Sequence, residues 1–416
     1  MKVGVKRRLA FVLSIWASSL AAQESFETEF RRGLVALAGN NLAAARRDLE
    51  DAALQQPANG LVWAALAQTY RRAGEADLAN KAAARADASA DANPAVEHAL
   101  ALYYAEAGDF SRAAGAERRF AASRAADHQA ATRAAELSLR AGDATQAMQW
   151  AKTALQHDDT AALHYILSQA YAAANQTLDG LRELRNAVER DPGNETYVAE
   201  LGEKELRRGD FTAALATLGN GRRHFPNSAQ IALSYGVAAY GERRFSDAID
   251  AFLTVIRIDP SVEQPYVFLS RLLDQAGERL PQITAAYAAW ERTAPANCLP
   301  ACLHAKALSA AGANPAAIEA DLRRSIALNS GYWESHFELG VLLAKSGRWE
   351  EAAAELARGI ELNPKHAAAH FQLARVYEKL GKTDLAKAER AKHQQLTAAE
   401  TDLERALPGA RNQPIP

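Results

Sequence analysis

The chain has 416 residues, with 48 Lys and Arg against 50 Asp and Glu, which gives a formal net charge of −2. The two signs of charge are interspersed, so nothing drives counterion release toward nucleic acid, and we exclude nucleic acid as a partner. Hydrophobic residues make up 49% of the chain but aromatic residues only 7%. The excess is largely Ala, which has the best helix propensity, and an all-α fold of closely packed helices is therefore predicted.

Residues 1–22 have the layout of a leader. Two lysines and two arginines precede an apolar run over residues 9–20, and small residues follow it. This is the pattern of a secretory signal peptide with cleavage near Ala21 or Ala22. The alternative is a membrane anchor, but the run is shorter than the roughly 20 apolar residues needed to cross a bilayer. The leader predicts a periplasmic or secreted protein with no stable membrane span after cleavage.

A period of 34 residues runs through the rest of the chain, marked by a small residue at the eighth position of each unit and an Ala at the twentieth. Gly33 and Ala45 mark the first unit, and Pro192, Pro226 and Pro260 stand 34 residues apart near the ends of later units. Pro cannot continue a helix, so these prolines predict turns between units. Eleven units are predicted over residues 23–400, at about 26–59, 60–93, 94–127, 128–160, 161–194, 195–228, 229–262, 263–297, 298–332, 333–366 and 367–400.

Two units depart from this pattern. The eighth has Gln282 where the Ala is expected, and the ninth is a residue or two longer, with Lys306 at the small position. In the last unit, the second helix is predicted to begin near Thr383 and to run on as a longer, charged closing helix, because a repeat array needs a cap at its end. Residues 401–416 are predicted to hold the end of this capping helix and a free tail.

Each unit is interpreted as two amphipathic helices. Trp63, Leu66 and Tyr70 fall at i, i+3 and i+7, on one face of the first helix of the second unit. Between the two helices of a unit, pairs such as Gly108 and Asp109 combine a residue that ends one helix with a residue that caps the next.

The small residues of the first helices are explained by close contact. Gly202, Gly236 and Gly340 are predicted to face the Ala of the second helix, so that the two helices of a unit approach closely.

The last two units repeat one phrase without slippage. Leu339 recurs as Leu373, and Gly347 recurs as Gly381. The phrase resembles the tetratricopeptide repeat, with its large residue, Leu-Gly pair, Tyr, Ala, Phe and Pro at fixed spacings. The resemblance implies a right-handed α-solenoid of about eleven helix-turn-helix units, whose first helices line a concave groove. It further implies a scaffold or adaptor that binds a protein or peptide.

In this family, groove contacts commonly come from about the second, fifth, ninth, twelfth and thirteenth positions of a unit, of which the fifth and ninth are considered. Carried onto the C-terminal third of this chain, the resemblance implies a ligand-binding groove lined by Val267, Arg271, Phe337, Val341, Phe371 and Arg375. These positions lack the Lys and Asn clamp of chaperone-binding members, which disfavours a chaperone C-terminus as the ligand. The alternative for Phe337 and Phe371 is that they fill the seam between units, since large apolar residues at helical spacing usually belong to the core.

The sequence lacks the common motifs for catalysis and cofactor binding. The sequence has no phosphate-loop pattern, no HExxH and no GxSxG, so no cofactor is predicted. His366 and His370 stand four residues apart, but two ligands do not make a closed zinc site, and no metal is predicted. His164, His336 and His370 all occupy the fourth position of their units, which favours a shared packing role.

Cys298 and Cys302 are the only cysteines. In an oxidising compartment, a disulfide across one helical turn is geometrically feasible, with a Cα separation of about 6 Å. The alternatives are two buried thiols that act as small apolar residues, and a metal site shared with His304.

The leading hypothesis for function is an exported, non-catalytic scaffold that holds a peptide or protein in its groove. The rival is a cell-envelope enzyme, or an accessory subunit of one, with catalytic residues gathered from distant units. A purely structural spacer is a third hypothesis. The scaffold is favoured because the repeats leave no uninterrupted second domain to house a catalytic site.

Overall fold

The computed structural model describes residues 24–90, 93–124 and 127–406. In these residues the regular elements are α-helices and short 3₁₀ turns, with no β-strand, so the predicted all-α fold is confirmed. The predicted leader lies outside the described residues, as does the tail from residue 407 on. No helix in the described part is both long and apolar enough to cross a membrane.

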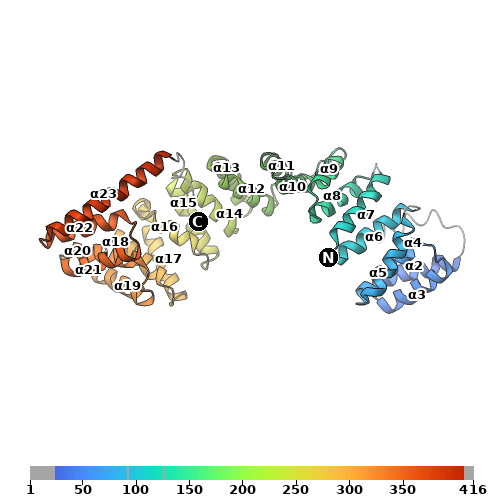
Figure 1. Ribbon diagram of the computed structural model, residues 1–416, viewed down its shortest axis with the longest axis horizontal. Helices are drawn as coiled ribbons and strands as arrows, with labels where there is room; N and C mark the ends of the chain where they lie inside the picture. Colours follow the sequence, from blue (N-terminus) through green and yellow to red (C-terminus); the bar gives the residue numbers. More distant parts are fainter. Residues whose placement is uncertain (1–23, 91–92, 125–126, 407–416) are drawn as a thin grey trace. The chain divides into compact units, whose positions relative to one another are not determined.

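The chain forms two compact bodies, divided between Asp191 and Pro192. Within each body, helices follow one another as hairpins, and each hairpin packs against the next (Figure 1). This is the architecture of an α-helical repeat solenoid, in which each unit buries its apolar faces against its neighbours.

The described part of the first body holds the five helix pairs up to Arg190. They are α2 (Glu24–Ala38) and α3 (Leu42–Gln55), α4 (Gly60–Arg72) and α5 (Ala76–Asp87), α6 (Pro94–Ala107) and α7 (Phe110–Ser123), α8 (His128–Arg140) and α9 (Ala144–Leu155), and α10 (Ala161–Ala173) and α11 (Thr177–Arg190). Their buried faces combine many alanines with fully buried leucines such as Leu49, Leu66 and Leu100.

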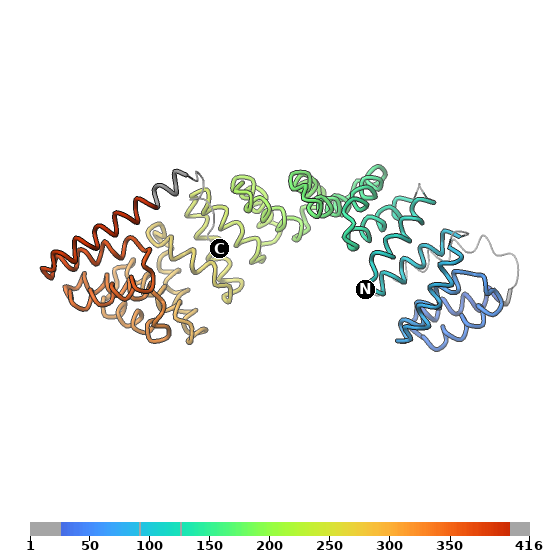
Figure 2. The backbone as a smooth tube through the Cα atoms, in the orientation of Figure 1, coloured from blue at the N-terminus to red at the C-terminus, as the bar shows by residue number. Residues whose placement is uncertain are grey.

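The described part of the second body holds the pairs from Glu195 onward, which Figure 2 traces from green to red. They are α12 (Glu195–Arg207) and α13 (Phe211–His224), α14 (Ala229–Gly241) and α15 (Phe245–Ile258), α16 (Gln264–Ser270) and α17 (Leu280–Thr293), α18 (Cys298–Ala310) and α19 (Pro315–Leu328), α20 (Trp333–Lys345) and α21 (Trp349–Leu362), and α22 (Ala367–Lys379) and α23 (Thr383–Ala406).

The turn inside each pair follows from local chemistry. Gly108 ends α6 in the left-handed conformation, with φ of 78°, where a side chain would be strained. The carboxylate of the next residue, Asp109, accepts a hydrogen bond of 3.1 Å from the backbone N–H of Arg112 and so caps α7. Asp143 and Asp210 cap α9 and α13 in the same way.

The small residues of the first helices allow close contact, but with a different partner from the one predicted. A Cβ on Gly236 would lie 2.6 Å from the ring of Phe252, and a Cβ on Gly340 would lie 2.6 Å from Cγ of Leu356. The prediction that these glycines face the Ala of the second helix is therefore wrong. They face the large residue that stands four positions after that Ala, such as Phe252 or Leu356. Its side chain lies across the helix pair and occupies the space that a Cβ on the glycine would need.

The two irregular units are irregular for different reasons. In the eighth, α16 has only seven residues, and two 3₁₀ turns at Leu273–Gln275 and Gly277–Arg279 replace the rest of the first helix. In the ninth, α18 begins 35 residues before α20, so the small position falls on the buried Ala305. The prediction that Lys306 occupies it is wrong by one residue.

The last helix is long, as the sequence predicts. α23 has 24 residues, whereas α21 in the preceding pair has 14. Because α22 has only 13 residues, α23 extends beyond the length that α22 can cover.

Candidate functional site

The first helices α16, α18, α20 and α22 form a series in the second body, each in contact with the next. The predicted groove residues lie on three of them. Val267 and Arg271 belong to α16 and its C-cap, Phe337 and Val341 to α20, and Phe371 and Arg375 to α22. The residues on α20 and α22 therefore lie on adjacent first helices. Val267 and Arg271 are separated from them by α18.

Exposure divides the six predicted residues into two sets. Phe371, Arg271 and Arg375 are exposed, and the Phe371 ring is 40% accessible. Val267, Phe337 and Val341 are partly buried, and the last two pack against the hydrophobic cluster around Leu339 and Leu343.

The ring of the residue that precedes the next first helix occupies the space beside Phe337. His366, the N-cap residue of α22, has its imidazole centroid 4.6 Å from that of Trp333 and 4.7 Å from that of Phe337. We call the first and fifth residues of a first helix the seat, here Trp333 and Phe337. The following N-cap residue fills this seat.

The ninth unit has the same arrangement with different residues. Its seat is Cys298 and Cys302, which stand 35 residues before Trp333 and Phe337 at the same places on α18. Tyr332, the N-cap residue of α20, packs against the cluster that contains Cys302.

The seat of the last unit, Ala367 and Phe371, opens into a pocket of about 490 Å³. The pocket is lined by His366, Ala367, Ala368, Phe371, His393 and Thr397. We call it the end pocket. The imidazole of His393 lies 5.3 Å from the Phe371 ring, and its Nδ1 donates to the carbonyl of Ala367 at 3.0 Å. The Arg375 guanidinium lies 5.8 Å from the centroid of the same ring.

Sequence reasoning missed His393 and Thr397 because both lie on α23, which it treated only as a cap. The spacing of the array does carry a signal for them. His393 stands 34 residues after Gly359, where a Cβ would come within 3.4 Å of the Phe337 backbone. A residue at that place in the last unit is thus expected to lie beside the seat.

A partly buried ionic group joins α18 to α20. Nζ of Lys306 donates to a carboxylate oxygen of Glu334 at 2.5 Å, and the Tyr332 hydroxyl donates to the other at 2.7 Å. Burial lowers the pKa of Lys306, but the charge of Glu334 outweighs it, and the net pKa is raised. Burial raises the pKa of Glu334, whereas the attraction of Lys306 more than offsets this and leaves it lowered. The pair is therefore ionised.

Histidines recur in a fixed pairing with acids. Nδ1 of each bonds a Glu carboxylate that follows 19 residues later, at 2.6–2.7 Å, in the pairs His98 and Glu117, His164 and Glu183, His336 and Glu355, and His370 and Glu389. The structure gives the fourth-position histidines a physical role, which is to tie the two helices of a unit together. The spacing of 19 could have been read from the sequence.

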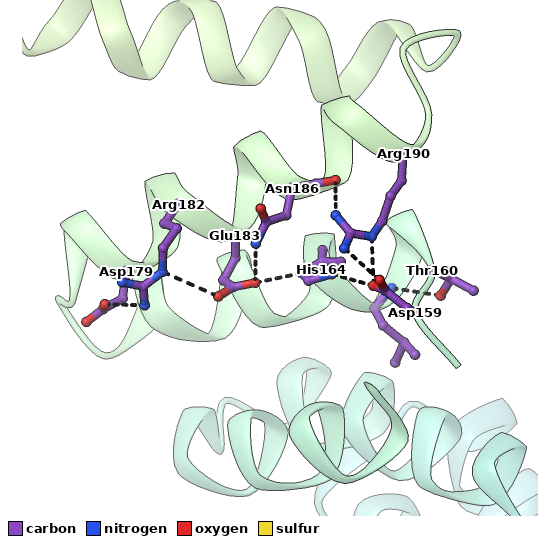
Figure 3. Close-up of polar contacts among 9 residues, drawn as sticks. Asp159, Thr160, His164, Asp179, Arg182, Glu183, Asn186 and Arg190 are labelled. Carbon is purple, nitrogen blue, oxygen red and sulfur yellow. Dashed lines mark hydrogen bonds and ion pairs between the residues drawn. The ribbon is translucent and has the colours of Figure 1, made fainter. Parts of the chain in front are cut away.

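The pair in the fifth unit is part of a larger network (Figure 3). Nε2 of His164 contacts Asp159 at 2.8 Å, and the Arg190 guanidinium donates to both oxygens of the same carboxylate at 2.7 and 2.6 Å. The hydrogen bonds from Arg190 and then from His164 lower the pKa of Asp159 to about 2. The loop before α10 is thus fastened to the end of α11.

Family comparison agrees with this architecture. Residues 199–263 and 302–360 match a family model described as tetratricopeptide repeat, and residues 342–381 match another described as TPR repeat. The chain is a tetratricopeptide repeat protein. No curated protein sequence matches it.

Several solved structures are similar to this tetratricopeptide repeat protein. The Cut9–Hcn1 hetero-tetramer is 14% identical, with 94% of this chain and 98% of that chain covered and a TM-score of 0.41. Yeast Tom70 is 13% identical, with 89% and 92% covered and a TM-score of 0.38. YrrB, described as a TPR protein with an unusual peptide-binding site, is 17% identical, with 51% and 91% covered and a TM-score of 0.31.

The cysteines of the repeat protein belong to a seat. Both are free thiols in the structure, with Cys302 buried and Cys298 half-buried. Burial, the largest cause, raises the pKa of Cys302 to about 12. The arrangement corresponds to the alternative of two small apolar residues, and oxidation of the pair stays a prediction.

His304, the further ligand in the alternative of a metal site with those cysteines, bonds other residues. Its Nδ1 bonds Asp321 at 2.9 Å and lies 4.0 Å from Glu291, whose carboxylate meets the Arg324 guanidinium at 2.9 Å. One imidazole and two carboxylates could in principle hold a cation. Here Arg324 supplies the positive charge, and the contact between His304 and Asp321 ties the two helices of the ninth unit together across 17 residues, not the 19 of the other pairs.

Proposed function

We propose that this repeat protein is an exported, non-catalytic scaffold that binds a protein or peptide on the first helices of its second body. The observation that carries the proposal is Phe371, a large aromatic side chain that is 40% exposed and flanked by Arg375. Exposed aromatic side chains near an Arg are typical of binding hot spots.

Repeat architecture supports a binding role. Stacked units create extended surfaces on which neighbouring helices contribute side chains to one ligand. The adjacent helices α20 and α22 offer Val341, Phe371 and Arg375, which combine apolar and positively charged groups. A helical or extended peptide with apolar and acidic residues fits such a surface.

The non-catalytic part of the proposal is supported by how the ionisable groups are used. Lys306 is held by Glu334, and the recurring histidines are held by their glutamates. Groups engaged in this way stabilise the fold, whereas a general base needs access to a substrate proton.

Export is proposed from the leader of residues 1–22, whose basic residues and short apolar run are typical of a secretory signal. A periplasmic or secreted location follows from it.

Site-specific photo-crosslinking in intact cells tests the function. A photoreactive residue at Val341 or Arg375 is expected to give discrete crosslinked species in the exported fraction. The matched control is Arg358 on the second helix α21, which is expected to give none. Equal crosslinking from Arg358, or no crosslinking from either first-helix position, would contradict the proposal. Turnover of a substrate by the purified protein in a broad hydrolase screen would favour the enzyme instead.

A further inference from the structure

The seats of the last three units differ in what fills them. Tyr332 packs at the Cys302 seat, and His366 packs between Trp333 and Phe337. Both fillers are rings carried by the N-cap residue of the following first helix. After α22, α23 closes the described chain, and the equivalent seat is the end pocket.

The end pocket has the chemistry to take a ring. Phe371 and the imidazole of His393 form its walls, with their centroids 5.3 Å apart, and Ala367 and Ala368 leave space beside them. Aromatic rings prefer centroid separations of about 4.5–7 Å, so a ring against Phe371 would repeat the contact that His366 makes with Phe337.

The surroundings of the pocket are positively charged. Residues 363–399 contain seven Lys or Arg and three Asp or Glu, a difference of +4, in a chain whose net charge is −2. The three acids are each engaged within the unit: Glu378 by Arg390, Asp384 by Lys387, and Glu389 by His370. The exposed Arg375, whose guanidinium lies 5.8 Å from the centroid of the Phe371 ring, therefore places positive charge at the rim of the pocket.

We propose that the end pocket binds an aromatic side chain from an acidic segment of a partner protein. The ring would take the place that His366 takes one unit earlier, and the acidic neighbours would meet the positive rim. The inference rests on the proposed protein-binding function and adds the chemistry of the partner.

Two segments of this protein itself fit the end pocket less well than a segment of a partner protein does. Residues 407–416, LPGARNQPIP, carry no aromatic and no acidic residue. The segment ESFETEF at residues 24–30 of a second copy has the right composition, but its Phe26 and Phe30 are 0% and 4% exposed in its own core. Both would have to leave that core to reach the pocket of another molecule.

The test uses fluorescence anisotropy with the full-length protein and the labelled synthetic peptide Asp-Glu-Trp-Glu-Asp. We expect saturable binding that weakens at least about tenfold when the peptide Trp is replaced by Ala, because buried aromatic anchors dominate such contacts. Replacing the four acids by Lys should abolish binding, and raising the salt from low to high concentration should weaken it, since exposed charges are screened.

Two variants of the protein address the pocket itself. Phe371→Ala removes a wall, and Ala368→Trp fills the space from an exposed position. Each should weaken peptide binding about tenfold or more, while the melting temperature falls by at most about 4 °C. The matched control is Leu385→Ala, which removes an exposed apolar side chain of α23 that does not line the pocket and should leave affinity unchanged.

Three results would overturn the inference. The first is equal binding of the Trp and Ala peptides, which would mean charge attraction alone. The second is unchanged affinity in both pocket variants. The third is a concentration-dependent dimer in sedimentation that Phe371→Ala dissolves, which would identify a second copy as the occupant. If any of these results is found while Val341 still gives crosslinks, the scaffold function is supported and only the proposed ligand of the end pocket is wrong.

Discussion

The imidazole of His366 meets the ring of Phe337 edge-on, with the centroids 4.7 Å apart and the ring planes at 89°. Phe337 lies on the first helix of the tenth unit, and His366 is the N-cap residue just before α22, the first helix of the eleventh. The contact makes Phe337 part of the seam between units, whereas Phe371, at the same place on α22, is 40% exposed.

Replacement by Ala should therefore destabilise the protein more at Phe337 than at Phe371. Phe337→Ala is expected to lower the free energy of unfolding of the second body by about 3 kcal/mol, because it leaves a cavity under His366. Phe371→Ala is expected to cost about 1 kcal/mol or less, since much of its ring is already in water. Urea unfolding followed by circular dichroism measures both. Equal losses would contradict the assignment of Phe337 to the seam.

Because the two helices of a pair lie in close contact, replacing Gly236 should destabilise the fold. Gly236→Ala is expected to cost about 1–3 kcal/mol, because the new Cβ would come within 2.6 Å of the Phe252 ring. Gly219→Ala in α13 is the matched control, with its nearest contact at an ordinary 3.5 Å. It should stabilise by about 0.5–1 kcal/mol, the usual gain from replacing a Gly inside a helix. Thermal melts of the two variants should shift in opposite directions.

Local signals in the sequence predict this fold better than long-range contacts do. Gly108 and Asp109 predicted a helix end and a cap, and both are present, because such signals act over a few bonds. Lys306 was placed one residue away from the small position, because the sequence shows that the ninth unit is longer but not where the extra residue falls, which is decided by packing against α20. The partners of His336 and His370 were missed, although a Glu recurs 19 residues after each, because the spacing alone does not show that the two helices turn these side chains toward each other.

The candidate site was less predictable than the fold. Phe371 and Arg375 were found through the repeat register, but the register applies equally to Phe337, which is covered. What distinguishes them is that His366 covers Phe337, whereas Phe371 is 40% exposed, and this coverage depends on tertiary packing. His393 enters the site only because α23 folds back along α22.

Removing one charge of the ionised pair Lys306 and Glu334, which joins α18 to α20, should destabilise the fold. Lys306→Ala is expected to lose about 3 kcal/mol, because it leaves the largely buried carboxylate of Glu334 without its cation. The double variant Lys306→Met with Glu334→Gln should recover most of this loss, since neither charge then remains. A double-mutant cycle in urea measures the coupling between the two side chains. Additive losses would show that the pair contributes no coupling.

Acid should weaken the network of Asp159. Its pKa is about 2 in the folded state, below the ordinary value of 3.8, so its contribution is fully present above about pH 4 and is lost as the pH falls toward 2. Asp159→Asn should therefore lower the melting temperature at pH 6 and make little difference near pH 2. Asp158→Asn, next to it in the same loop, is the control. A difference between wild type and Asp159→Asn that stays constant from pH 6 to 2 would contradict this.

The two thiols should differ in reactivity. In reduced, folded protein at pH 8, Cys302 is expected to resist alkylation, because a pKa of about 12 leaves a thiolate fraction of about 10⁻⁴ and its side chain is buried. Cys298 should react first, and both should react once the protein is unfolded. Mass spectrometry after brief labelling distinguishes the two sites.

The oxidation state of the same pair needs a separate measurement. The prediction from an exported chain is that unreduced protein from an oxidising compartment leaves both thiols unlabelled on unfolding. Labelling of both without reductant would show that they function as free, apolar seat residues.

The short first helix of the eighth unit bears on how unfolding would spread. Repeat arrays gain stability from contacts between neighbouring units, and opening propagates until it meets a weak coupling. Between Ser270 and Leu280, the i to i+4 bonds of a helix give way to i to i+3 bonds such as that from the N–H of Ala276 to the carbonyl of Leu273. Amide hydrogen exchange in the second body should therefore fall into two protection groups, one on each side of residues 271–279, which would open as separate cooperative units.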